Sequence, residues 1–246
     1  AEGWLPPDLR LIGVAEADID LRRSGGEWAG SAEWRQVDST LRVIEAADRH
    51  TDVSVPAVSV TALLVDGGLD VEADVVIEPG VTGRLEFALS PMTKDGVVTA
   101  ELALSGDDWQ WISAVIPQID QFQGSINALV RASGPIVSPE LNGDLSWRRG
   151  ALLVPSLNVP LRDIELVVSG GTRGTATLTG SAQAGGGLLR LAGRFDDLMR
   201  PARTLRLEVT GEAAEIVNWP EYRLWATPEL VLSGFADEWR VDGKLG

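Results

Sequence analysis

The chain has 246 residues, of which 44% are apolar, so it can form a packed core and is too apolar for a disordered chain. Its formal net charge of −15 argues against binding to nucleic acid and against docking on an anionic membrane, because either would need a basic patch. The basic residues form no run longer than a pair such as Arg148-Arg149. The absence of cysteine excludes disulfides, thiol catalysis and cysteine-ligated zinc.

Apolar and polar residues alternate along most of the chain, which is typical of strands with one dry and one solvated face. The alternation is clearest at residues 69–77, 81–89, 175–184, 205–209 and 239–245. Turn-forming residues separate such runs. They are Asp66-Gly67-Gly68, Pro79-Gly80, Lys94-Asp95-Gly96, Arg149-Gly150, Gly170-Gly171 and Gly185-Gly186-Gly187. We therefore predict an all-β protein of roughly 16 strands in which each strand pairs with its neighbours in sequence.

Residues 107–123 interrupt the alternation. Ile112, Val115, Ile116 and Ile119 recur at helical spacing, and Pro117 would end or kink a helix there. We predict a short amphipathic helix, capped by Asp107 or Asp108, between strand segments 1–106 and 124–246 of one continuous domain. A weaker helical turn is predicted at 212–219. The chain begins without a signal peptide and ends in a strand pattern, so we expect a fragment of a longer protein.

A sheet with one apolar face must bury that face against another part of the protein or a partner. Two arrangements fit the alternation: a sandwich of two sheets, or a curved antiparallel or mixed sheet folded along its length into an open hydrophobic groove. In such a groove, roughly 16 strands spaced at ~4.8 Å would extend ~75 Å. Alternation by itself favours the sandwich.

Catalytic and metal-binding patterns are absent from the sequence. His50, the single histidine, lies in a polar stretch and is interpreted as a surface residue. The pairs Asp107-Asp108 and Asp196-Asp197 lack EF-hand spacing, and Gly185-Gly186-Gly187 lacks the lysine and the following helix of a phosphate loop. The nine tryptophans are spread over the chain and are interpreted as filling the sheet interior or its rims. We predict a protein that is not an enzyme and has no cofactor or metal.

Residues 124–195 contain an ordered series of motifs. Gly124 opens a strand, and Ser133-Gly134, "PELNGDLSWRRGALLVP", "PLRDIELVVSG" and "TLTGSAQAGGGLLRLAGRF" follow in order. With "WISAVIPQID" upstream and "PEYRLWATPELVLSG" downstream, this series resembles the C-terminal region of the TamB family. The TamB family is the inner-membrane subunit of the bacterial translocation and assembly module. The resemblance covers residues from about 107 to 246. The first hundred residues are similar only in having the same kind of alternating strands.

The resemblance implies a periplasmic groove, the "β-taco" of AsmA-like bridge-like lipid-transfer proteins, in a full-length protein anchored to the inner membrane. Its implied partners are phospholipid acyl chains and, through parts outside this chain, a TamA-like outer-membrane barrel of the Omp85 family. The implied work is transport of phospholipid from the inner to the outer membrane and outer-membrane biogenesis. The residues expected to line the groove are Leu85, Phe87, Leu141, Leu145, Trp147, Leu178, Leu189, Leu191, Leu205, Leu207, Leu230, Leu232 and Val241.

Two other functions stay open at this point. An assembly module would receive unfolded outer-membrane proteins, including autotransporters, by strand addition at its sheet edges or in its trough. A polysaccharide-active protein would gather its tryptophans and a pair of carboxylates in one cleft.

Overall fold

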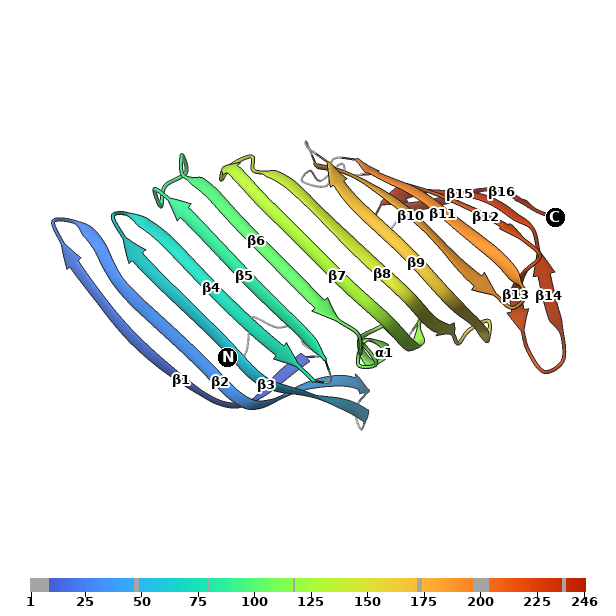
Figure 1. Cartoon of the computed structure of the whole chain (residues 1–246), viewed down its shortest axis with the longest axis horizontal. Helices are drawn as coiled ribbons and strands as arrows, with labels where there is room; N and C mark the ends of the chain where they lie inside the picture. The colour runs from blue at the N-terminus through green and yellow to red at the C-terminus, as the bar shows by residue number, and fades with distance from the viewer. Residues whose placement is uncertain are drawn as a thin grey trace. The chain divides into compact units, whose positions relative to one another are not determined.

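The computed structural model describes residues 9–46, 49–78, 80–116, 118–171, 174–196, 204–235 and 238–246. These residues form sixteen strands and one short helix. Fourteen strands belong to a single antiparallel sheet, whose order follows the sequence from β1 to β12 and then continues with β15 and β16, while β13 and β14 form a separate pair (Figure 1). The prediction of an all-β meander is therefore confirmed. The alternative arrangement, a sandwich of two large sheets, is not observed, because fourteen strands pair edge to edge in one sheet.

The chain divides into two compact units. The first unit comprises residues 1–115 and 129–140, and the second comprises residues 116–128 and 141–246. Strand β7 contributes its second half to the first unit and its first half to the second unit. The division therefore runs both through β7 and directly after residue 115, inside the segment 107–123 for which the sequence predicts a helix.

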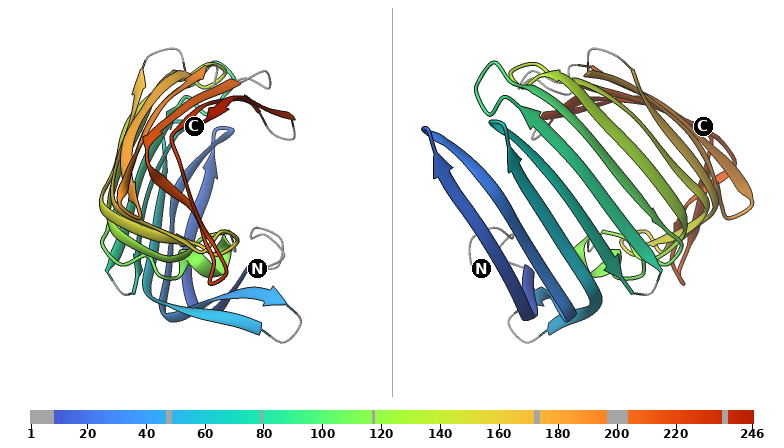
Figure 2. Two further views of the ribbon diagram at one scale, coloured as in Figure 1. Left: turned by 90° about the vertical axis from the view of Figure 1, so that its right-hand side faces the viewer. Right: turned by 60° about the vertical axis from the view of Figure 1, so that its left-hand side comes forward.

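The first unit consists of long antiparallel strands that are visibly curved along their length, most strongly in β2 and β3 (Figure 2). Its elements are β1 (Leu9–Ser24), β2 (Glu27–Ala46), β3 (Arg49–Val65), β4 (Gly68–Ile77), β5 (Val81–Ser90), β6 (Val97–Gly106), α1 (Ile112–Val115) and part of β7 (Asp120–Pro135). The predicted turn between β3 and β4 is confirmed. Asp66 and Gly67 both have positive φ, at 50° and 70°, as a two-residue type I′ hairpin requires.

The second unit continues the same pairing of sequence neighbours. Its further strands are β8 (Glu140–Val154), β9 (Val159–Gly171), β10 (Thr175–Ala184), β11 (Gly187–Asp196), β12 (Thr204–Glu212), β13 (Ala214–Asn218), β14 (Arg223–Ala226), β15 (Pro228–Phe235) and β16 (Glu238–Leu245). The separate β13–β14 hairpin packs on the sheet, because Val159, Ala184 and Ala214 form one buried cluster with Leu161 and Leu189 against it. One small buried cluster of this unit therefore lies beside the hairpin.

The helical predictions were largely wrong. The helix is confined to Ile112–Val115, and residues 120–123 already belong to β7. The amide of Ile112 bonds to the Trp109 carbonyl at 2.9 Å, three residues back, so the segment starts as a tight turn. A proline at 117 provides no amide to extend a helix beyond that turn. At 212–219 the chain forms β13 instead, because pairing with β14 satisfies its backbone groups where a helix of two turns would be marginal.

The predicted turn at Arg149-Gly150 is also wrong. Both residues lie inside β8, where the pairing with β9 shifts between Trp147 and Gly150. Arg149 has a φ of 51°, so the glycine and its neighbour mark a β-bulge and not a chain reversal.

Candidate functional site

The registers of the second unit place its predicted site residues on one face of the sheet. Directly paired residues of antiparallel strands point to the same side, so each set of partners forms a row across the strands. The central row runs from β8 to β16 through Leu145, Val168, Leu178, Gly193, Leu207, Leu232 and Val241. This row contains glycine and aliphatic residues only.

Two further rows flank the central one. The first contains Trp147, Leu166, Gly180, Leu191, Val209, Leu230 and Gly243, and the second contains Gly143, Gly170, Ala176, Phe195, Leu205, Gly234 and Trp239. Leu141 lies on the same face of β8, two residues before Gly143. We call these three rows the apolar face of the second unit. The three rows contain every predicted site residue of this unit except Leu141 and Leu189, and Leu189 lies on the same face of β11, two residues before Leu191.

The first unit has an apolar face of its own. Leu85 lies in a row that contains Ala17, Trp34, Val60, Ala73, Leu85 and Leu102. Phe87 lies in the next row, with Ile19, Ala32, Ala62, Val71 and Ala100. A polar residue enters the following row: Gln36 is paired with Ala15 and Val58 and is buried.

None of the predicted site residues is fully buried. All are half-buried except Val241, whose exposed fraction is 59%. In a closed core, aliphatic side chains of this size would be almost completely buried. Within the described residues, the chain therefore leaves most of these rows without a covering layer. Uncovered apolar surface on this scale is typical of sites that bind an apolar partner.

Two of the predicted site residues are packed against the protein itself. Leu189 contacts the buried cluster beneath the β13–β14 hairpin, so it is covered by the chain. Trp147 stacks on Phe122 with 4.5 Å between ring centroids, and its indole N–H donates a 2.9 Å hydrogen bond to the Gln123 carbonyl. Trp147 is thus an anchor between β8 and β7.

We expect Trp147→Phe to lower the free energy of unfolding by about 1 kcal/mol. Phenylalanine keeps a ring against Phe122 but lacks the N–H, so the hydrogen bond to Gln123 is lost. Urea denaturation followed by circular dichroism measures the change. Trp225→Phe, at a position that is 55% exposed on β14, is the matched control. An unchanged midpoint for Trp147→Phe would contradict the anchoring role.

The opposite face of the first unit carries a row of acids. Partners across β1 to β6 are Asp18, Glu33, Thr61, Glu72, Glu86 and Glu101. Like charges directly opposite each other destabilise a sheet, and arginines lie among them. The guanidinium of Arg84 is 2.9 Å from Glu86, and that of Arg131 is 2.7 Å from Glu101. The hydrogen bond to Glu86 and the charge of Asp74 raise the pKa of Arg84. These exposed pairs keep this face solvated and each contributes little to stability.

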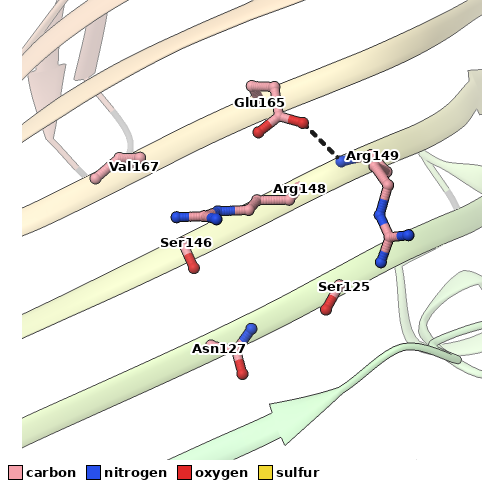
Figure 3. Close-up of a pocket in the computed structure, with 7 residues that line it drawn as sticks. All are labelled: Ser125, Asn127, Ser146, Arg148, Arg149, Glu165 and Val167. Carbon is pink, nitrogen blue, oxygen red and sulfur yellow. Dashed lines mark hydrogen bonds between the residues drawn. The ribbon is translucent and has the colours of Figure 1, made fainter.

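The polar face of the second unit contains a shallow depression of about 860 Å³ beside the β8 bulge (Figure 3). It is lined by Ser125 and Asn127 from β7, Ser146, Arg148 and Arg149 from β8, and Glu165 and Val167 from β9. Ser146 and Val167 are register partners, which places them on the face opposite Leu145 and Trp147. The depression is therefore separated from the apolar face by the sheet itself.

Sequence inspection missed several members of the apolar rows, including Val168, Val209 and Phe195. Val167 and Val168 are adjacent valines, and alternation alone does not say which one faces the dry side. Register shifts within β8–β9 and β9–β10 change the phase of the alternation along these strands. The pairing with Leu145 and Leu178 is what places Val168 on the apolar face.

The other sequence candidates lie apart from these faces. His50 is exposed on β3, with its Nε2 3.9 Å from Asp52. Trp109 lies 6.0 Å from Trp111, while Trp219 contacts Tyr222, so the described tryptophans do not gather in one cleft as a polysaccharide site would require. Within the described ranges, no group of three histidine or carboxylate side chains is arranged to hold a metal ion. The single described helix is too short to cross a membrane.

Neither the protein-family models, nor the curated proteins, nor the solved structures contain a match to this chain. Function must therefore be inferred from the two faces of the sheet.

Proposed function

We propose that the apolar faces bind phospholipid acyl chains. The observation that carries this proposal is the row from Leu145 to Val241, which crosses seven strands without a polar residue and without complete burial. Each methylene that moves from water onto such a surface contributes about 0.8 kcal/mol, so an acyl chain can bind without contacts to its head group.

The extent and chemistry of the face favour an acyl chain over a compact ligand. Six spacings of about 4.8 Å between seven strands extend roughly 29 Å, which suits a long flexible chain. Ligand sites for compact molecules contain a few polar groups that fix orientation, whereas the only polar side-chain atoms in the three rows are the indole nitrogens of Trp147 and Trp239. A ligand on this surface is free to slide along it.

In the wider proposal, the chain is a segment of a periplasmic TamB-like groove that conducts phospholipid between the inner and outer membranes. The apolar face would be the inner wall of the groove and the charged face its outer wall. Attachment to the inner membrane and docking to a TamA-like Omp85 partner would be made by other parts of the full-length protein. The sequence resemblance over residues 107–246 supports this assignment.

Native mass spectrometry of the purified chain tests the acyl-chain proposal. We expect adducts with the masses of phospholipids, which disappear after extraction with a mild detergent and return after incubation with phospholipid vesicles. Lipid-free protein that does not take up lipid from vesicles would contradict the proposal.

Strand addition is a second candidate function, because the sheet has an edge at β16. In the described part of the chain β16 pairs with β15 alone, and its Val241 and Leu245 are each 59% exposed. An exposed apolar edge strand can receive an unfolded strand of another protein. A photo-crosslinker at Leu207 and at Leu245 separates the functions: lipid adducts at Leu207 favour acyl-chain binding, and polypeptide adducts at Leu245 favour strand addition.

A further inference from the structure

The β8 bulge places two neighbouring arginines on the same face of the sheet. In a regular strand Arg148 and Arg149 would point to opposite sides. Two residues of β8, Arg148 and Arg149, lie opposite the single residue Glu165 of β9, between the pairs Trp147–Leu166 and Gly150–Ile164. Arg149 turns through a φ of 51°, and its side chain joins that of Arg148 in the depression on the polar face (Figure 3). We infer that this depression binds a phosphate-type oxyanion.

The two guanidinium groups are available for a ligand. Within the described residues, neither forms an ion pair with a carboxylate. Other arginines of this unit do so: Arg194 is 2.8 Å from Asp196, Arg206 is 3.2 Å from Glu208, and Arg190 is 3.4 Å from Glu212. Among the described arginines of this unit, Arg162 and Arg223 also lack a carboxylate partner, but only Arg148 and Arg149 are adjacent in the sequence.

The surroundings add hydrogen-bond donors. The hydroxyl groups of Ser125 and Ser146 and the amide of Asn127 line the depression together with the arginines. Figure 3 shows Arg149 extending toward β7 beside Ser125, while Arg148 runs along β8 toward Ser146. The two guanidinium groups therefore approach from different directions, which suits a tetrahedral oxyanion better than a planar carboxylate.

Glu165 holds the bulge and limits the charge of the site. Its Oε1 accepts a 2.9 Å hydrogen bond from the Arg149 amide. The carboxylate also faces the depression, so it repels an anion and leaves the site with a net charge of about +1. We therefore expect weak binding that improves when this single negative charge is removed.

The site does not depend on acyl-chain binding, because it lies on the other side of the sheet. Its ligand chemistry is a phosphate group, from inorganic phosphate or from a phospholipid head group. Loss of this site would leave the lipid adducts of the full chain unchanged, so the two proposals fail separately.

Titration of the isotope-labelled chain with inorganic phosphate, followed by NMR of the Ser146 and Arg149 backbone amides, tests the inference. Sodium chloride at equal ionic strength is the reference. We expect Arg148→Gln and Arg149→Gln each to weaken phosphate binding about 3- to 10-fold, and the double variant to abolish it. Glu165→Gln should strengthen binding about 3-fold, since glutamine keeps an acceptor for the Arg149 amide without the charge.

Two controls carry the same charge changes elsewhere in the unit. Arg206→Gln and Glu208→Gln on β12 should leave phosphate binding unchanged.

Glycerol 3-phosphate identifies the source of the phosphate: tighter binding than that of inorganic phosphate indicates a lipid head group, and equal binding indicates free phosphate. Equal effects of chloride and phosphate on these amides, or equal losses in Arg206→Gln, would overturn the inference. The spectrum of each variant shows whether it is folded.

Discussion

Leu207→Glu should reduce the phospholipid bound to the purified chain at least tenfold. Leu207 lies in the central row of the apolar face, between Gly193 on β11 and Leu232 on β15. An ionised carboxylate beneath an acyl chain would lose its hydration without gaining a partner, which costs more than the about 1.4 kcal/mol that a tenfold change represents. Quantitative lipid extraction, normalised to protein, measures the effect.

The sheet should tolerate this change, because Leu207 is half-buried and a glutamate there can reach solvent in the lipid-free state. Thr179→Glu on β10 is the matched control. It adds the same charge at an exposed position of the polar face and should retain its lipid. Leu232→Glu in the same row should repeat the loss. Full lipid content in both Leu207→Glu and Leu232→Glu, with native circular dichroism, would refute acyl-chain binding on this face.

Gly124→Ala should lower the free energy of unfolding by about 2–4 kcal/mol. Gly124 has a φ of +119°, where a residue with a Cβ atom is strained. A Cβ atom there would lie 2.6 Å from the indole nitrogen of Trp147 and 2.7 Å from the Cα atom of Gly150. The substitution would therefore displace the tryptophan from Phe122 and disturb the pairing of β7 with the bulged part of β8.

Gly186→Ala is the control for this substitution. A Cβ atom at Gly186 would meet nothing within 4 Å, and Gly186 is not in the left-handed region. Its stability should stay within about 0.5 kcal/mol of the parent or rise slightly, because alanine restricts the unfolded chain. Chemical denaturation of the two variants side by side measures the difference. Equal stability would show that β7 and β8 can separate at this point without cost.

The segment "SPELNGDLSW" shows how far local pattern reaches. Alternation predicts that Leu141, Leu145 and Trp147 share a face, and the structure confirms it through the pairing of Leu145 with Val168 and of Trp147 with Leu166. From the same pattern, all three residues are predicted to line the groove. The structure separates them, because Trp147 is held by Phe122 and Gln123 while Leu145 remains in the uncovered row.

The next residues show where local pattern fails. Arg149-Gly150 has the composition of a turn, yet β8 continues through it with an extra residue. A bulge forms where two residues of one strand lie opposite a single residue of its partner. The sequence of the bulged strand does not specify how many residues the partner contributes. The oxyanion site on the polar face arises from that mismatch, so inspection of β8 by itself could not find it.

The strands and the chemistry of their two faces could be predicted from the sequence, because alternation with period two is a local property of each strand. The predicted site residues include most of the non-glycine positions in the three rows of the second unit, but only Leu85 and Phe87 from the rows of the first unit. Only the folded chain shows which residues are neighbours in a row and which apolar side chains are covered. It also shows that Arg148 and Arg149 lie on the same face of the sheet. These depend on register, bulges and the placement of the β13–β14 hairpin, all of which arise from pairing between segments distant in the chain.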